Sequence, residues 1–350
     1  MPDRDAAAWL WLRERLAALR PAARLGTQPS PVPVAPAVVV RTAVVTDSAS
    51  ALPPDWVRSC AGDGRLTVIP MPVMVGAEIY GEGEDDITET IALALASGTS
   101  VKTSRPSPGQ FEQVFLAAER LGYESVVSIH ISGGLSGTAD AARLAATRVA
   151  IPVEVLDSST VGMALGMGVQ AAVAAAAAGS DTTAVAAAAA AQFARTKVYF
   201  YVPSLEQLRR GGRIGAAASL LGTMFAIKPI LAVDDGKIIP LEKVRSAVKA
   251  VARLEELATA DAASRPHGQA RLAVHHFGNP AEAEALAARL SAALPSCPPA
   301  QISSLPAVLA AHAGLGVLAV IVGENGPTVR NPESELPAAR RRSFHPAIST

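Results

Sequence analysis

Short apolar runs with strand character alternate along this sequence with segments of helical length, and no other feature constrains the fold as strongly. In the first part of the chain these runs lie at residues 39–45, 66–75, 125–131 and 153–156. The intervening segments are helical in character, and Ser107 opens one of them with capping-box spacing. Strands that alternate with helices form βαβ units, in which the strands run parallel and the helices cover the sheet. The sequence therefore predicts an α/β fold that begins with a parallel sheet.

The pattern becomes less regular after residue 195, where we place a domain boundary. Further strands are predicted at 197–203, 228–233, 237–242, 271–277 and 317–322, with helices at 244–260 and 280–293 and an apolar helix that ends near Phe225. We expect two α/β domains, residues 41–195 with a parallel, Rossmann-like sheet and residues 196–323 with a mixed sheet. Residues 1–40 are predicted to form a short helix and a Pro-rich linker, and residues 324–350 a polar tail.

The charge balance argues against a nucleic-acid partner. Lys plus Arg and Asp plus Glu each number 31, so the formal net charge is zero and no basic stripe is visible. A protein that binds nucleic acid normally carries a basic excess. We therefore expect a protein that acts on small molecules or on other proteins.

The apolar stretches do not predict stable insertion into a membrane. The N-terminal stretch is interrupted by charges at residues 13–15, unlike a signal peptide. Residues 161–178 are mostly Ala and Gly, which insert weakly, and residues 305–323 contain Pro306 and His312. A cytoplasmic protein is the expectation.

Motifs that would hold a cofactor are not found. Cys60 and Cys297 lie far apart with no CxxC pattern, so two reduced thiols are expected rather than a zinc site or a redox pair. His275 and His276 are adjacent on a predicted strand and should point to opposite faces, which argues against one shared metal. The segment Gly-Gly-Arg-Ile at 211–214 matches neither a P-loop nor a dinucleotide fingerprint. We expect no cofactor.

Three loops in the first domain carry small hydroxyl side chains after predicted strands. They are Asp47-Ser48, Thr103-Ser104 and residues 132–138. Ligands of parallel α/β sheets bind outside the carboxyl ends of the strands, so these loops should converge. The third loop also opens a helix at Ser136-Gly137-Thr138, where free N–H groups and the helix dipole favour an anion. Hydroxyls with few cations suit a carboxylate better than a polyphosphate, although each Ser or Thr could instead serve only as a helix cap.

Ser136 also permits an enzymatic interpretation. Its surroundings resemble a nucleophile elbow, but Thr138 stands where the second Gly of G-x-S-x-G should be. Asp157 and His312 could in principle complete a catalytic triad. A serine hydrolase that acts on acyl esters through Ser136 is therefore the alternative hypothesis.

Taken together and in order, these segments resemble the motifs of the DegV family. Residues 131–138, I-S-G-G-L-S-G-T, are similar to the family's I-S-S-x-L-S-G-T, and residues 205–214 match L-x-x-L-x-x-G-G-R-I. The complete set of similar segments spans about residues 41–323 and comprises 46–53, 68–80, 103–107, 131–138, 157–158, 205–214, 228–245 and 312–316.

The resemblance implies a two-domain α/β fold with one long-chain fatty acid buried between the domains. Several members of the family are the binding subunit of a bacterial fatty acid kinase, and they present the acyl carboxylate to a separate ATP-dependent kinase subunit. Such a chain is a binding protein rather than an enzyme in its own right. The residues implied to bind the ligand are Thr103, Ser104, Ser132, Ser136, Gly137 and His312. Arg213 and Arg245 are implied to lie near the entrance, where they would face the kinase subunit.

Three positions depart from the family's pattern. Gly133 replaces the second Ser of I-S-S, Arg105 replaces the commoner Gln, and Leu315 replaces the Pro of H-x-G-P-G. Gly133 leaves open which hydroxyl makes the main contact with the carboxylate, and Arg105 either adds a positive charge to the site or points into water. An acyl carrier without a kinase partner fits the same sequence.

Overall fold

The computed structural model describes residues 42–81, 87–220 and 227–324. Three predictions therefore lie outside the described residues. They are the N-terminal helix and linker, the polar tail beyond Glu324, and the end of the apolar helix predicted up to Phe225.

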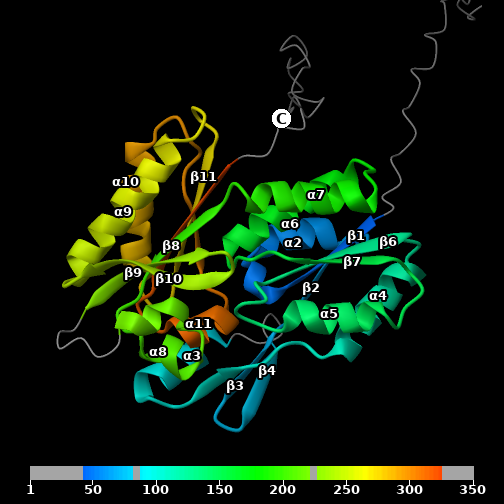
Figure 1. Ribbon diagram of the computed structural model, residues 1–350, viewed down its shortest axis with the longest axis horizontal. Coiled ribbons are helices and arrows are strands. Elements are labelled where there is room, and N and C mark those ends of the chain that lie inside the picture. Colours follow the sequence, from blue (N-terminus) through cyan, green and yellow to red (C-terminus); the bar gives the residue numbers. More distant parts are fainter. Residues whose placement is uncertain (1–41, 82–86, 221–226, 325–350) are drawn as a thin grey trace, which may run out of the picture. The chain divides into compact units, whose positions relative to one another are not determined.

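A four-stranded parallel sheet forms the first half of the fold. Its strands lie in the order β2-β1-β6-β7, and the bounds are β1 Thr42–Asp47, β2 Leu66–Ile69, β6 Ser125–His130 and β7 Val153–Asp157. The helices are α2 Pro54–Ala61, α4 Pro108–Arg120, α5 Thr138–Ala146, α6 Met163–Ala177 and α7 Thr182–Phe193. Figure 1 shows α6 and α7 on one side of the sheet and α4 and α5 on the other. The predicted parallel α/β sheet is confirmed.

Alternating side chains explain why helices cover both faces of this sheet. Val44 and Val127 are fully buried in the cluster that includes α6 and α7, whereas Val45 and Val126 belong to the cluster of α4 and α5. Successive residues of a strand point to opposite faces, so an uninterrupted apolar strand needs an apolar partner on each side. Helix α6 also packs closely against the turn that follows β1, because a Cβ atom at Gly166 would lie 2.4 Å from the carbonyl oxygen of Ser50.

A six-stranded mixed sheet forms the second half. Its order is β10-β9-β8-β13-β11-β12, in which only the β11–β12 pair is parallel. The strands are β8 Lys197–Tyr201, β9 Lys228–Asp234, β10 Lys237–Val244, β11 Ala270–His276, β12 Gln301–Ser304 and β13 Leu318–Glu324. The helical elements are α8 Glu206–Arg210, η2 Gly215–Leu220, α9 Ala247–Ala263, α10 Pro280–Ala293 and α11 Ala307–Ala313. The predicted mixed sheet is confirmed.

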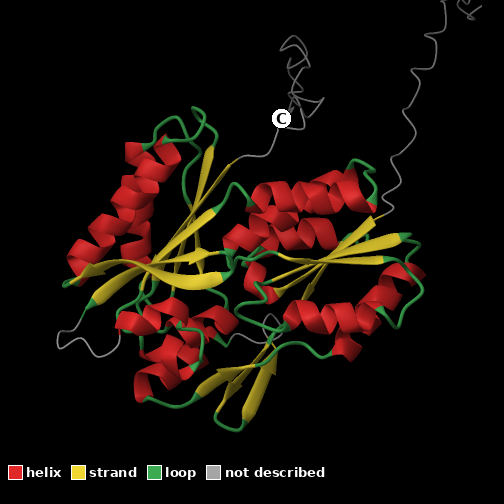
Figure 2. Ribbon diagram, viewed as in Figure 1, coloured by secondary structure: helices red, strands yellow, loops and turns green. Residues whose placement is uncertain are grey.

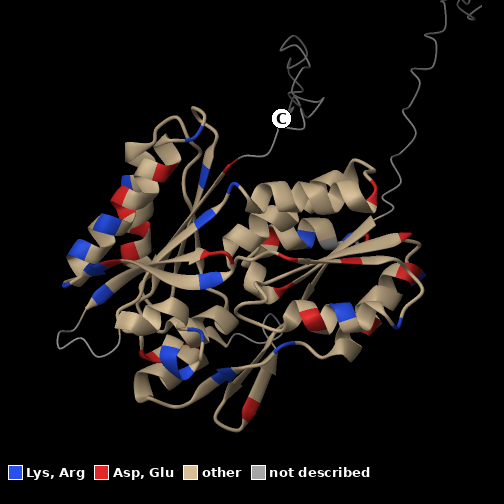
Figure 3. Cartoon of the chain, viewed as in Figure 1, with Lys and Arg blue, Asp and Glu red and all other residues tan. Residues whose placement is uncertain are grey.

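The two faces of the mixed sheet pack differently. One face, with Tyr201, Leu318 and Val320, is buried against α9 and α10, which lie together on one side of the sheet in Figure 2. The opposite face, with Phe200 and Ala319, belongs to the cluster that also contains residues of the first sheet. In Figure 3, basic and acidic residues are interspersed along α9 and α10 instead of being separated by sign.

A small antiparallel sheet was not predicted from the sequence. Its order is β4-β3-β5, with β3 Pro72–Val75, β4 Glu78–Gly81 and β5 Val101–Thr103, and α3 Thr88–Ser97 lies between β4 and β5 in sequence. The prediction of one strand over residues 66–75 is wrong, because the chain leaves the parallel sheet after Ile69. Pro70 has no N–H for a strand ladder, and the N–H of Met71 donates to Ser48 Oγ at 3.0 Å. Thr103 is the last residue of β5, so the Thr103-Ser104 loop leaves this small sheet and not the parallel sheet.

A buried polar network fixes the carboxyl ends of β1 and β6. Asp47 is fully buried, and its carboxyl oxygens accept hydrogen bonds from the N–H groups of Ala49 (3.1 Å) and Ile131 (3.0 Å). The same carboxyl group lies 3.0 Å from His130 Nδ1, and His130 Nε2 lies 2.6 Å from Ser128 Oγ. Because these groups are cut off from water, their mutual hydrogen bonds hold the start of the 132–138 loop in one position.

Candidate functional site

A cavity lies against the face of the mixed sheet that α9 and α10 leave uncovered. The space between its atoms amounts to about 810 Å³, a figure that includes solvent at the open side. Strand residues with the same orientation form one wall, namely Val198, Phe200, Ala319 and Ile321. Further residues without polar side chains complete the lining: Met71, Ile131, Leu135, Val161, Gly162, Leu208, Val233, Ile238, Leu305, Val308, Leu309, Ala313 and Val317.

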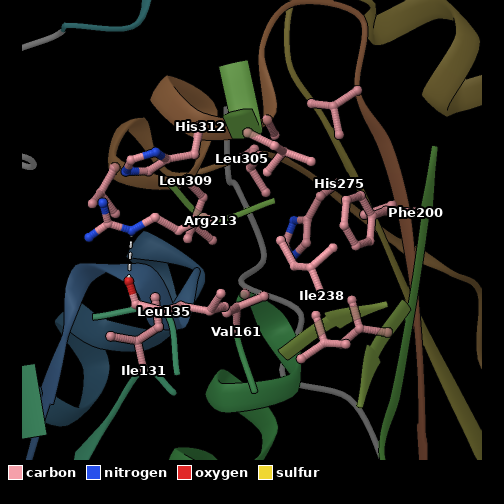
Figure 4. A pocket seen from close by; sticks show the side chains of 18 of the residues that line it. Ile131, Leu135, Val161, Phe200, Arg213, Ile238, His275, Leu305, Leu309 and His312 are labelled. Carbon is pink, nitrogen blue, oxygen red and sulfur yellow. Dashed lines mark hydrogen bonds between the residues drawn. The ribbon is translucent and has the colours of Figure 1, made fainter. Parts of the chain in front are cut away.

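The polar side chains of the cavity gather at one end. Thr103, Ser136, Arg213 and His312 line this end together with Leu135. In Figure 4, His312 and Arg213 lie on one side of the cavity, and Phe200, His275 and Ile238 lie on the opposite side. The arrangement suits an elongated apolar molecule with one polar group.

His275 is the one polar side chain of the lining outside that end, and its polar atoms are already bonded. It is 1% exposed, its Nε2 accepts from the N–H of Met163 at 3.0 Å, and its Nδ1 lies 2.9 Å from Ser303 Oγ. Burial lowers the pKa of His275 to about 4, so the ring is neutral near pH 7. Because Nε2 accepts, Nδ1 carries the proton and donates to Ser303. His275 therefore offers the cavity only its ring surface.

The hydrogen bond between Thr103 and His312 forms the core of the polar end. Thr103 Oγ1 lies 2.7 Å from His312 Nε2, which joins the end of β5 to the last turn of α11. Burial, with a smaller contribution from the positive charge of Arg213, lowers the pKa of His312 to about 4. The site thus presents a neutral imidazole and a hydroxyl to a ligand, with Arg213 beside them.

Gly211 allows His312 to occupy this position. A Cβ atom at Gly211 would lie 2.1 Å from His312 Nδ1, which is a collision. Gly212, by contrast, has φ +71° and meets no nearby atom, so it serves the turn itself. The first glycine of the Gly-Gly-Arg-Ile segment is therefore required for close packing, and the second for backbone conformation.

Arg213 and Arg105 place two guanidinium groups at the outer side of the polar end. Arg213 donates from Nε to the carbonyl of Leu135 at 2.9 Å and from Nη1 to that of Gly211 at 2.5 Å. Arg105 lies over Gly137, where a Cβ atom would come within 2.6 Å of its Nη1. Both border a solvent-open hollow at the start of α5, which we call the outer hollow; its lining residues are Thr103, Ser104, Arg105, Ser136, Gly137 and Arg213.

Two of the predicted site residues line neither the cavity nor the outer hollow. Ser132 is 1% exposed, and its hydroxyl donates to the carbonyl of Gly236 at 2.7 Å and accepts from the N–H of Gly134 at 3.1 Å. It ties the loop to the β9–β10 turn. Arg245 is exposed and follows Val244 at the end of β10, which is the end of the hairpin opposite that turn.

The residues of the hypothetical catalytic triad are not joined. Ser136 Oγ lies 2.8 Å from Thr138 Oγ1, and Asp157 accepts from the N–H groups of Gly133 (3.0 Å) and Ser159 (2.9 Å). His312 is bonded to Thr103. A base bonded to the nucleophile and oriented by an acid is what the mechanism requires. The hydrolase hypothesis therefore finds no support in this geometry.

Comparison with known proteins agrees with the geometry. Residues 41–325 match the model of the family described as "Uncharacterised protein, DegV family". The chain belongs to the DegV family. A DegV domain-containing protein of Streptomyces coelicolor is 42% identical over 280 residues, which cover 80% of this chain and 97% of that one.

Solved structures of DegV proteins share the fold. A protein from Thermus thermophilus, described as a fatty-acid-binding DegV family protein, is 31% identical with a TM-score of 0.74, covering 81% of this chain and 100% of that one. DegV from Bacillus subtilis, described as a fatty acid binding protein, is 29% identical with a TM-score of 0.74, covering 81% and 99%.

Two further features of the described part of this DegV chain bear on its chemistry. Within residues 42–81, 87–220 and 227–324, no group of three or more His, Cys, Asp or Glu side chains could hold a metal ion. None of the helices in these same ranges is long and apolar enough to cross a membrane.

The sequence pattern missed most of the apolar lining of the DegV cavity. Phe200, Ala319 and Ile321 were expected only as strand residues, and a strand that faces a cavity has the same alternation as one that faces a core. His275 was considered only as a metal ligand. The signal that could have singled it out is a histidine on an otherwise apolar strand face, paired with Ser303 on the next strand.

Acid should destabilise the protein through its two low-pKa histidines. The pKa of His275 and of His312 is about 4 in the folded chain, against an ordinary value of 6.5. Between these values the unfolded chain binds protons that the folded chain does not, so the free energy of unfolding falls as the pH falls. One histidine accounts for about 3 kcal/mol at most. Urea unfolding at about pH 7 and about pH 4.5 measures the difference.

The matched variants are His275→Gln and, as control, His267→Gln at an exposed histidine. We expect the pH dependence of the unfolding free energy to be smaller in His275→Gln and unchanged in His267→Gln. The same pH dependence in all three proteins would contradict the assignment of His275 as a buried neutral group.

Proposed function

We propose that this chain binds one long-chain fatty acid, with the acyl chain in the cavity and the carboxylate at the polar end. The observation that carries the proposal is the distribution of polarity along the cavity, with Thr103, Ser136, Arg213 and His312 at one end and apolar surface elsewhere. Each buried methylene is worth about 0.8 kcal/mol, so a sixteen-carbon chain could gain on the order of 10 kcal/mol before ordering costs. The Thermus thermophilus and Bacillus subtilis relatives, described as fatty-acid-binding, support the same ligand class.

The carboxylate is proposed to contact Thr103 and Ser136, with His312 behind Thr103. If His312 donates from Nε2 to Thr103 Oγ1, the threonine hydroxyl keeps its proton free for the ligand. The other ring nitrogen then stays unprotonated against Gly211, where a proton would find no acceptor among the described residues.

Gly137 and Ser104 lie in the outer hollow, where the N-terminus of α5 favours an anion. Ser132 is proposed to act indirectly, because its hydrogen bond to the carbonyl of Gly236 holds the 132–138 loop in place.

We also propose that the folded chain consists of two domains, residues 41–195 and 196–323. The cavity lining supports this division, because Ile131, Leu135 and Val161 come from the first segment and Phe200, Ile238 and others from the second. A ligand held there would lie between the two sheets. A cytoplasmic location, consistent with the free thiols of Cys60 and Cys297, is part of the proposal.

We also propose that the bound carboxylate is presented to a separate ATP-dependent kinase subunit, which forms an acyl phosphate. The support is the outer hollow, which opens to solvent directly beside the carboxylate contacts. A phosphoryl group added to the carboxylate would enter this hollow between Arg105 and Arg213, and guanidinium groups match phosphate oxygens well. The chain carries no nucleotide-binding fingerprint of its own, so ATP would come with the partner.

Fatty acid binding should stabilise the protein and depend on the two hydroxyls. At about 100 times its dissociation constant, palmitate or oleate should add about 2.7 kcal/mol to the free energy of unfolding. Thr103→Ala and Ser136→Ala should each weaken binding by about 1–3 kcal/mol, as a lost hydrogen bond to a charged group does. Thr147→Ala, at the far end of α5, is the matched control and should bind like the wild type. Thermal unfolding and titration of a delipidated sample measure both effects.

Two results would contradict the binding proposal. One is an unchanged melting temperature with every fatty acid tried. The other is rapid turnover of acyl esters that Ser136→Ala abolishes, which would restore the hydrolase hypothesis.

The kinase step should depend on arginines that fatty acid binding does not need. Arg105→Gln and Arg245→Ala should leave fatty acid affinity nearly unchanged and lower acyl-phosphate formation when a cognate kinase subunit and ATP are supplied, because a guanidinium stabilises phosphate charge or contacts the partner. Arg143→Gln, on the exposed side of α5, is the control. Equal loss of binding and phosphorylation would place the arginine on the ligand itself. No acyl phosphate with any variant or with the wild type would favour an acyl carrier without a kinase.

A further inference from the structure

Three cavity residues lie in one row across neighbouring strands of the mixed sheet. His275 on β11 pairs in register with Ala319 on β13, and Ala319 pairs with Phe200 on β8. Residues in register point to the same face, and all three line the cavity. The smallest side chain of the row thus lies between two rings. We call this feature the Ala319 notch, made of His275, Ala319 and Phe200.

The width of the notch matches one hydrocarbon chain. Neighbouring strands are about 4.7–4.9 Å apart, so the backbones of β11 and β8 are separated by about 9–10 Å. A methylene chain in contact with a ring on each side needs about 7–8 Å, because carbon atoms pack at about 3.5–4.0 Å. A straight chain fits between the rings, and a methyl branch, which widens the chain by about 1.5 Å, would take up the space that is left.

The rings cannot move aside easily. His275 is held by the N–H of Met163 and by Ser303, and both partners are lost if the ring rotates. Phe200 is 7% exposed within the apolar cluster. The cavity-lining residues on either side of Ala319 along the chain are Val317 and Ile321, which are both larger. Room for a ligand above this strand therefore depends on the small side chain of Ala319.

We propose that the Ala319 notch holds the distal part of the acyl chain as a single unbranched segment, and that Ala319 determines how long a chain the protein accepts. The inference rests on the proposed binding of fatty acids and adds the class of acid, namely long and unbranched at its distal part. The notch lies on the side of the cavity opposite Arg213 and His312, where the distal carbons of a ligand anchored at its carboxylate would lie (Figure 4).

Titration with a series of saturated fatty acids of increasing length tests the notch. Wild-type affinity should rise about fourfold per methylene until the chain fills the cavity. Ala319→Leu should bind short acids like the wild type and lose affinity for the longest acids by more than about tenfold, because the added side chain fills the space of several methylenes. Phe200→Leu should raise the affinity for acids with a methyl branch near the distal end relative to straight acids.

Ala273→Val is the matched control, since Ala273 lies on the same sheet face in the adjacent row and does not line the cavity. The affinity of Ala273→Val for each saturated fatty acid should equal that of the wild type. Circular dichroism checks folding, and Ala319→Val repeats the comparison with a smaller insertion if Ala319→Leu does not fold.

Two results would overturn the proposed role of the Ala319 notch and leave wild-type binding intact. One is an equal loss of affinity for acids of every length in the Ala319 variants, and the other is no loss of affinity for the longest acid. A wild-type protein that binds no acid of any length overturns the proposed function, and the notch with it.

Discussion

The apolar side chains on one face of the mixed sheet impose the constraint on which the site depends. The opposite face is buried under α9 and α10, but this face borders the cavity. A hydrocarbon chain bound as proposed would make dispersion contacts with this apolar surface. The sheet that stabilises the second half of the chain would then also supply most of the proposed affinity for the ligand.

The polar end depends on groups that are far apart in sequence. The Thr103–His312 hydrogen bond joins residues 209 positions apart, and the Ser132–Gly236 bond joins residues 104 positions apart. The carboxylate of Asp47 accepts a hydrogen bond from the N–H of Ile131 and so fixes the start of the 132–138 loop. These bonds hold the hydroxyls of Thr103 and Ser136 at the polar end of the cavity, so that a carboxylate would meet oriented donors without a large ordering cost.

The sequence was most informative where local pattern decides structure. The alternation of strands and helices predicted the parallel sheet, and the ordered motifs led to the family. The split of residues 66–75 between two sheets was missed, because it depends on Pro70 together with the contact of Met71 to Ser48. Ser132 and Ser136 look equivalent in sequence, but the approach of Gly236 occupies the hydroxyl of Ser132. Tertiary contacts of this kind are not encoded in the spacing of a motif.

Native mass spectrometry of the protein purified from a bacterial host shows directly whether the chain carries a fatty acid. We expect a species heavier than the chain by one long-chain fatty acid, which disappears on delipidation and returns when palmitate or oleate is added. A mass equal to that of the chain alone, both as purified and after incubation with either acid, would contradict the proposed binding of a fatty acid.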